Sequence, residues 1–91
     1  MTTHTVKSWS YLFQAIKLGM KKHDIRDTRD RNYNIGDTII LREFDQTKGM
    51  YTGDELTCSI TYITDRNTPC AFSSSVLDRD FCILTIQPIN D

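Results

Sequence analysis

The sequence has no long apolar segment. Its apolar runs extend over only a few residues, far short of the ~18 that a membrane-spanning helix needs. The first six residues, Met1 to Val6, lack the apolar core of a signal peptide. We therefore expect a cytoplasmic protein that has no contact with a membrane.

Cysteine is also scarce, and its spacing gives no metal-binding motif. The three cysteines, Cys58, Cys70 and Cys82, include no C-x-x-C pair. A zinc site needs a fourth ligand, and His4 and His23 do not have zinc-finger spacing. Cys58 and Cys82 fall in strand-like segments, where a free thiol packs as a small apolar side chain. We expect no metal and no cofactor.

The strongest helix signal is an apolar stripe near the beginning of the chain. Positions 9, 12, 13 and 16 are apolar and share one face of a helix. Gly19 follows this stripe, as is typical of a helix end in the left-handed conformation. The pattern predicts a helix over residues 9–18, with Ser8 or Ser10 as its N-terminal cap.

Alternating apolar residues predict about five strands, over residues 3–7, 22–27, 38–44, 55–64 and 81–86. In the second of these strands, we expect His23 and Ile25 to face the core and the charged residues to face away. Tyr33 and Ile35 are expected to return to the core after a polar loop. Residues 65–79 are irregular, and Phe72 is their expected anchor on the core.

One helix and about five strands favour a single small domain over residues 1–91. The helices are too few for a doubly wound sheet, whereas a closed or nearly closed barrel removes exposed sheet edges. The expected fold class is therefore α+β, with a small, mostly antiparallel β-barrel and one main N-terminal helix.

Charge is unevenly distributed along the chain. Residues 17–31 contain six Lys or Arg and three Asp, a local net charge of +3, whereas the rest of the chain carries −4. The overall net charge is only −1. Positive charge gathered beside the first helix–strand junction indicates an anion site, for which phosphate is the first candidate.

The order of several short motifs resembles a known family. They are His4-x-Val6-Lys7, Tyr11-x-Phe13-x-Ala15-Ile16-Lys17-x-Gly19-x-Lys21, Asp24-Ile25-Arg26, Tyr33-x-Ile35-Gly36-Asp37, Leu41-x-Glu43-Phe44-Asp45, Tyr51-Thr52-Gly53 and Thr61-Tyr62-Ile63. This combination resembles the small ASCH-related domains with a PUA-like barrel, which occur in bacteria and phages and often have no assigned function. The resemblance covers about residues 3–64 and the final strand. Asp24 stands where that family usually has glutamate, and His23 where it has an aromatic or aliphatic residue.

The resemblance implies an RNA- or nucleotide-binding module with a basic cleft between the first helix and the barrel. Lysines supply point charges for phosphates, arginines hold phosphates with paired hydrogen bonds, and Tyr33 or Trp9 stacks on an unpaired base. The expected nucleic-acid contacts are Lys21, Lys22, Arg26, Arg29, Arg31 and Tyr33. The expected cleft-lining residues are His4, Lys7, Trp9 and Asp24, and Asp24 is expected to orient Arg26.

The same run of charges has a second interpretation. Asp24, Asp27 and Asp30 alternate with the arginines and neutralise them in a solvated loop. The overall charge of −1 also argues against tight, sequence-independent binding, which requires many uncompensated cations.

Two other function classes stay open. One is a phage-type protein-binding module that acts on a host protein through an acidic face, whose candidate residues are Asp37, Glu43, Asp45, Asp54, Glu55, Asp78 and Asp80. The other, less favoured, is an amidohydrolase acting on acetylated cytidine, as one branch of ASCH proteins implies. Lys21 matches the lysine of that scheme, but Asp24 stands at its threonine position and its late glutamate has no counterpart. A His4–Asp24 acid/base pair would require the first two strands to be neighbours.

Overall fold

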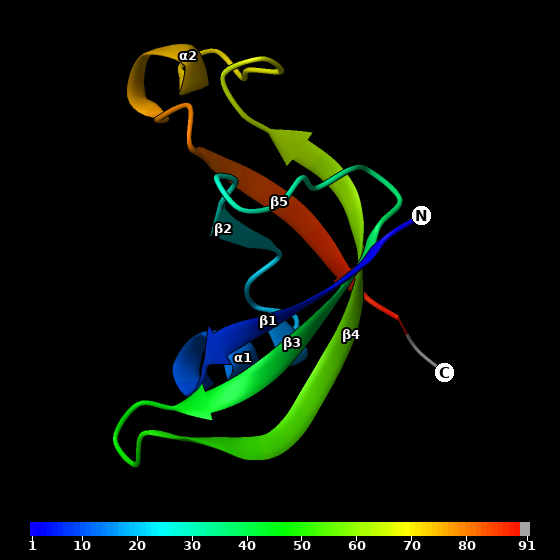
Figure 1. The fold of residues 1–91 in the computed structure, drawn as a ribbon, viewed down its shortest axis with the longest axis vertical. Coiled ribbons are helices and arrows are strands. Elements are labelled where there is room, and N and C mark those ends of the chain that lie inside the picture. Colours follow the sequence, from blue (N-terminus) through cyan, green and yellow to red (C-terminus); the bar gives the residue numbers. More distant parts are fainter. Residues whose placement is uncertain (90–91) are drawn as a thin grey trace.

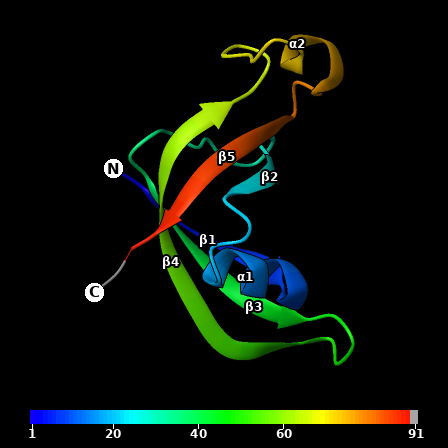
Figure 2. The same ribbon diagram turned by 180° about the vertical axis from the view of Figure 1, so that it is seen from behind.

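The fold is one strongly curled sheet with a helix packed against it. The computed structural model describes residues 1–89. Its elements in chain order are β1 (Thr3–Trp9), α1 (Ser10–Lys17), β2 (His23–Asp27), β3 (Thr38–Asp45), β4 (Met50–Thr64), α2 (Ser73–Val76) and β5 (Phe81–Pro88). Figures 1 and 2 show α1 beside β1 and β3, and α2 at the opposite end of the molecule.

The strands follow the order β1-β3-β4-β5-β2 across the sheet. The β1–β3 pair is parallel, and the other three neighbouring pairs are antiparallel. The expectation of a small, mostly antiparallel α+β domain is therefore confirmed. The sheet is a curled half-barrel, however, with one parallel pair and a second short helix that the sequence did not predict. No helix of the described residues is long and apolar enough to cross a membrane.

The core lies inside the curl, and α1 closes one end of it. Phe13 and Ile16 of α1 are almost completely buried, as the apolar stripe predicted. They pack with inward-facing side chains of every strand except β2; the buried apolar set is Val6, Phe13, Ile16, Ile39, Leu41, Cys58, Ile60, Cys82, Leu84 and Ile86. The N-terminus of α1 has no side-chain cap. The Ser10 hydroxyl instead donates a hydrogen bond to the carbonyl of Phe44 at 3.2 Å.

The face of β2 that points to the core is the one that was expected to point away from it. His23 is exposed and Ile25 is 57% exposed, whereas Asp24 is only 6% exposed. The reason is an ion pair, because Arg26 donates a hydrogen bond to the Asp24 carboxylate at 2.6 Å and makes burial of that charge tolerable. Apolar periodicity alone therefore gave the wrong face for this strand.

One other departure from simple alternation has a local cause. The β4–β5 register shifts between Ile60 and Tyr62, so Tyr62 is exposed while Ile63 packs against the core. Such a bulge reverses which side chains point inward.

The loop residues also differ from expectation. Phe72 is 72% exposed and is no anchor, whereas Ser73 is 3% exposed, donating to the Asp65 carbonyl and accepting from the Cys70 amide. Ile35 is 58% exposed, and of the two loop residues expected in the core only Tyr33 packs there.

Candidate functional site

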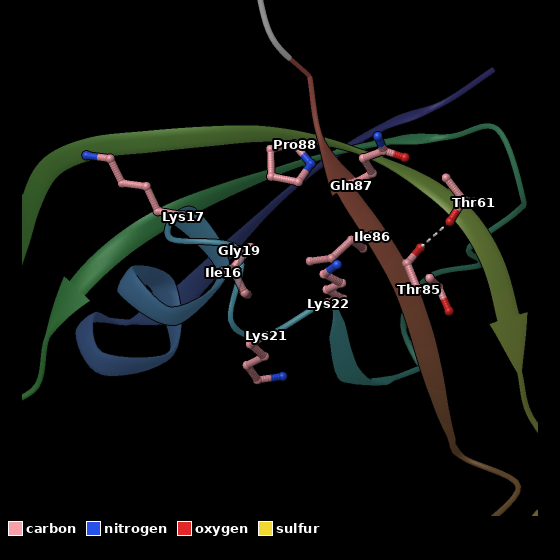
Figure 3. Close-up of a pocket in the computed structure, with 10 residues that line it drawn as sticks. All are labelled: Ile16, Lys17, Gly19, Lys21, Lys22, Thr61, Thr85, Ile86, Gln87 and Pro88. Atoms are coloured by element: carbon pink, nitrogen blue, oxygen red, sulfur yellow. Dashed lines mark hydrogen bonds between the residues drawn. The ribbon is translucent and has the colours of Figure 1, made fainter.

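A basic hollow of about 480 Å³ lies between the end of α1 and strands β4 and β5 (Figure 3). One side is formed by residues at and after the end of α1, and the other by neutral residues of the two strands. The lining residues are Ile16, Lys17, Gly19, Lys21, Lys22, Thr61, Thr85, Ile86, Gln87 and Pro88. The hollow therefore has the position expected from the sequence, between the first helix and the sheet.

Gly19 directs the chain into this hollow. Its φ of 79° lies in the left-handed region, and its amide bonds to the Ile16 carbonyl at 3.1 Å, ending the helix. The amides of Met20 and Lys21 both bond to the Ala15 carbonyl, so the chain turns back sharply. The Lys22 carbonyl then accepts from the amide of Ile86 on β5 at 3.0 Å. Backbone geometry thus brings the two lysines beside β5.

None of the three lysines of the hollow forms an ion pair with a carboxylate of residues 1–89, although, besides a hydrogen bond from Gln14, the charge of Lys17 contributes to lowering the pKa of Glu43. The ion pairs in that range are His4–Asp37, Asp24–Arg26, Asp27–Arg29 and Arg42–Glu55. Lys17 and Lys22 are exposed, and the Lys21 ammonium donates to the backbone carbonyl of His23. Figure 3 shows Lys17 extending away from Lys21 and Lys22.

Arg26 lies at a different place, the seam between the two edge strands β1 and β2. Its Nε donates to Asp24 Oδ2 at 2.6 Å and its Nη2 to the Lys7 carbonyl at 3.0 Å. The predicted contact between Asp24 and Arg26 is therefore present. Because this guanidinium bonds to both β1 and β2, it joins the two edges of the curled sheet.

A second hollow, of about 350 Å³, opens at this seam, which we call the seam hollow. It is lined by Lys7, Ser8, Trp9, Leu12, Ile25 and Arg26. The residues expected in one cleft are thus distributed, with Lys21 and Lys22 in the basic hollow and Arg26, Lys7 and Trp9 in the seam hollow. Asp24 lines neither hollow, and its carboxylate pairs with Arg26 rather than with Lys21, the pairing that the amidohydrolase scheme would require.

His4 pairs with Asp37 rather than with Asp24. Its Nε2 lies 2.8 Å from Asp37 Oδ2, and both side chains are almost fully buried. The carboxylate also accepts from the amides of Thr2 and Asn34. The hydrogen bond from His4, followed by that from the Thr2 amide, lowers the pKa of Asp37. Sequence reasoning took Asp37 for a turn residue and an acidic-face candidate, and missed this pair.

The remaining predicted contacts are less available to a ligand. Arg29 forms a hydrogen-bonded ion pair with Asp27, and this contact lowers the pKa of Asp27 to about 2. Arg26 and Arg29 are therefore neutralised by neighbouring carboxylates, as the second interpretation of the charge run expected. Arg31 and Asp30 form no ion pair within residues 1–89. The Tyr33 ring packs against His4, with ring centroids 4.6 Å apart, and is partly buried.

Glu43 is a second buried carboxylate that sequence reasoning placed on an acidic surface. It is 6% exposed and accepts from Gln14 Nε2 at 3.1 Å and Thr52 Oγ1 at 2.8 Å. These hydrogen bonds, with that from Gln14 the largest cause, lower its pKa. Since Gln14 belongs to α1, Glu43 fixes the helix on β3 and β4. Asp37 and Glu43 are both buried, so neither belongs to the proposed acidic face.

Comparison with protein families matches residues 3–86 to a domain of unknown function, DUF3850. The match covers most of the chain, and the protein belongs to this family. The chain is also 40% identical, over 62 residues, to a protein of Escherichia phage P2 named "Uncharacterized 12.9 kDa protein in GpA 3'region". The aligned part is 68% of this chain and 54% of that relative, so the chain spans about half of its length.

Proposed function

We propose that this DUF3850 protein binds single-stranded RNA or a nucleotide-like anion in the basic hollow. The observation that carries the proposal is the set of three lysines lining it, none of which forms an ion pair with a carboxylate within residues 1–89. Its volume of about 480 Å³ falls within the range of small-molecule sites. Thr61, Thr85 and Gln87 supply uncharged hydrogen-bonding groups on the opposite side.

We further propose that the half-barrel is a PUA-like fold of the ASCH-related type. Support comes from the curled five-stranded sheet with α1 at one end, and from Gly19 and Lys21 of the resembling motif at the basic hollow. We place the protein in the cytoplasm. Its three cysteines are all free, a state that the reducing cytoplasm maintains.

The proposed binding is moderate and depends on salt. Each lysine that neutralises a phosphate of a single strand contributes about −0.7 to the slope of log K against log salt concentration. The three lysines of the basic hollow therefore predict a slope of about −2, smaller than that of strongly basic nucleic-acid-binding proteins. This value agrees with an overall net charge of −1, which opposes long-range attraction of RNA.

The test is fluorescence anisotropy with a labelled single-stranded RNA at several salt concentrations. Lys21→Ala/Lys22→Ala should weaken binding at low salt and make the slope less steep by about 1.4. Lys48→Ala, in the exposed turn between β3 and β4, removes one positive charge far from the hollow and serves as the control with Lys22→Ala. Equal effects of Lys22→Ala and Lys48→Ala, or no binding by the unaltered protein, would refute the proposal.

A second candidate role is binding of a host protein, which we propose as the alternative. The observation that favours it is the exposed apolar surface at α2, where Phe72 is 72% and Val76 81% exposed. Large exposed apolar groups are typical of protein contact surfaces. Phe72→Ser/Val76→Ser should then abolish association with a host protein while leaving RNA anisotropy unchanged. If RNA binding is absent, and if the unaltered protein and the Phe72→Ser/Val76→Ser variant associate equally with host proteins, this alternative also fails.

A further inference from the structure

The seam hollow combines groups that the basic hollow lacks. It has an aromatic ring, Trp9, which is 44% exposed, beside the apolar side chains Leu12 and Ile25. Ser8 and Arg26 add a hydroxyl group and a guanidinium. The basic hollow, in contrast, has no aromatic residue in its lining. The two hollows therefore suit different parts of a ligand.

The Ser8 hydroxyl is an unusual feature of this hollow. Ser8 is only 4% exposed, and its hydroxyl forms no hydrogen bond with any other residue of the range 1–89. Fully enclosed side-chain polar atoms in this range all have partners. The hydroxyl must therefore keep an opening, and Ser8 lines the seam hollow. A buried hydroxyl facing such an opening is available to a ligand, since leaving it without a partner costs free energy.

Arg26 has hydrogen-bonding capacity left after it joins the two strands. A guanidinium has five N–H groups. One binds Asp24 and one binds the Lys7 carbonyl, and the other three have no acceptor in residues 1–89. Because Asp24 and the Lys7 carbonyl hold it at two atoms, the group is oriented before any ligand arrives. It offers donors only, so it favours a partner whose edge carries acceptors.

We propose that the seam hollow is a nucleobase pocket. An unpaired base stacks on the Trp9 indole, and its edge receives hydrogen bonds from Arg26 and exchanges one with Ser8. The N–H donors of arginine can both be accepted by a purine edge that carries the acceptors O6 and N7. The adenine edge has an amino group, a donor, in place of O6 and accepts only at N7. The preferred base is therefore a 6-oxopurine. This inference extends the proposed function from the phosphate to the base, through residues separate from the lysines.

The experiment uses uncharged nucleosides, so contacts with phosphate make no contribution to the measured affinity. Trp9 is the only tryptophan of the chain, so quenching of its fluorescence reports directly on this hollow. Inosine and adenosine differ at position 6, oxygen against an amino group, and form a matched pair of probes. We expect saturable quenching by both, with inosine binding at least about fivefold more tightly.

Variants separate the groups involved. Ser8→Ala should weaken inosine binding about three- to tenfold, the effect of one hydrogen bond, whereas Ser75→Ala on exposed α2 should change nothing. Thermal unfolding followed by circular dichroism verifies that Ser8→Ala is folded. Trp9→Leu, assayed by calorimetry, should weaken binding about tenfold or more through loss of stacking, while Tyr62→Leu, at an exposed tyrosine that does not line the seam hollow, leaves it unchanged.

The outcomes distinguish this inference from the proposed function. Lys21→Ala/Lys22→Ala should lose salt-dependent RNA binding yet retain quenching by inosine. If RNA binds through the lysines but inosine causes no saturable quenching, or if adenosine equals inosine and Ser8→Ala has no effect, the nucleobase pocket is refuted alone. If inosine binds but the lysine variant binds RNA normally, the proposed phosphate site fails and the nucleobase pocket stands.

Discussion

Two Asp-x-Arg pairs follow one another along the chain and form an internal comparison. Asp24 and Arg26 at the seam have side chains that are 9% and 20% exposed, whereas Asp27 and Arg29 are 37% and 65% exposed. Arg26→Met should lower the free energy of unfolding by about 2–3 kcal/mol, because it leaves the Asp24 carboxylate buried without a partner. We place the cost near the lower end of the range for buried pairs, since Arg26 retains some contact with water.

Urea unfolding followed by circular dichroism measures this difference. A loss of about 2–3 kcal/mol corresponds to a fall of roughly 10–20 °C in the thermal midpoint for a domain of this size. Arg29→Met is the matched control and should not change the unfolding midpoint measurably, since an exposed pair contributes little.

A double-mutant cycle isolates the interaction. Asp24→Ala/Arg26→Met removes both charges, and we expect it to be more stable than the sum of the single variants predicts, by about 1 kcal/mol or more. The reasoning is refuted if Arg26→Met and Arg29→Met are equally stable, or if the cycle shows no coupling. In that case the burial of Asp24 and Arg26 at the seam would not determine how much their ion pair contributes to the free energy of unfolding.

Three further predictions follow from single groups. At neutral pH, a thiol reagent should label the exposed Cys70 before the buried Cys58 and Cys82. The pKa of Cys70 is lowered mainly by a hydrogen bond from the Phe72 amide, whereas burial raises the pKa values of Cys58 and Cys82 to about 11. Acid titration should show stability falling as the pH decreases below about 4, because hydrogen bonds lower the folded-state pKa values of the buried carboxyls of Asp37 and Glu43; constant stability there would contradict this. Gly19→Ala should cost about 1 kcal/mol in urea unfolding, because its φ of 79° strains other residues; an unchanged midpoint would contradict that strain.

Much of the architecture could be predicted from periodicity. The stripe ending before Gly19 gave the helix to within a residue at each end, and the alternation around Cys58 and Cys82 gave two strands and two buried thiols. These signals are local, because each side chain is placed by its own backbone period. Of the residues expected in one cleft, only Lys21 and Lys22 lie in the basic hollow, where the backbone after Gly19 brings them beside β5.

The parts that could not be predicted depend on contacts between distant segments. Nothing near Asp37 in the sequence indicates His4 as its partner, because the contact arises only when the start of β1 meets the loop before β3. The face of β2 was wrong for the same reason, since Asp24 is buried together with Arg26, which reaches across to the Lys7 carbonyl of β1. The division into two hollows likewise depends on how the edges meet, which apolar patterns do not determine.

The strand order also constrains when the domain can form during synthesis. The first strand pairs with β3, and β2 pairs only with β5, the last strand in the order of the described residues. A chain emerging from the ribosome N-terminus first therefore exposes β2 without a partner until residues 81–88 are available. The β3–β4 hairpin can assemble much earlier because its strands are close in sequence. Joining the two sheet edges is thus a late folding event, and mutations that weaken the seam should accelerate unfolding more than they slow folding.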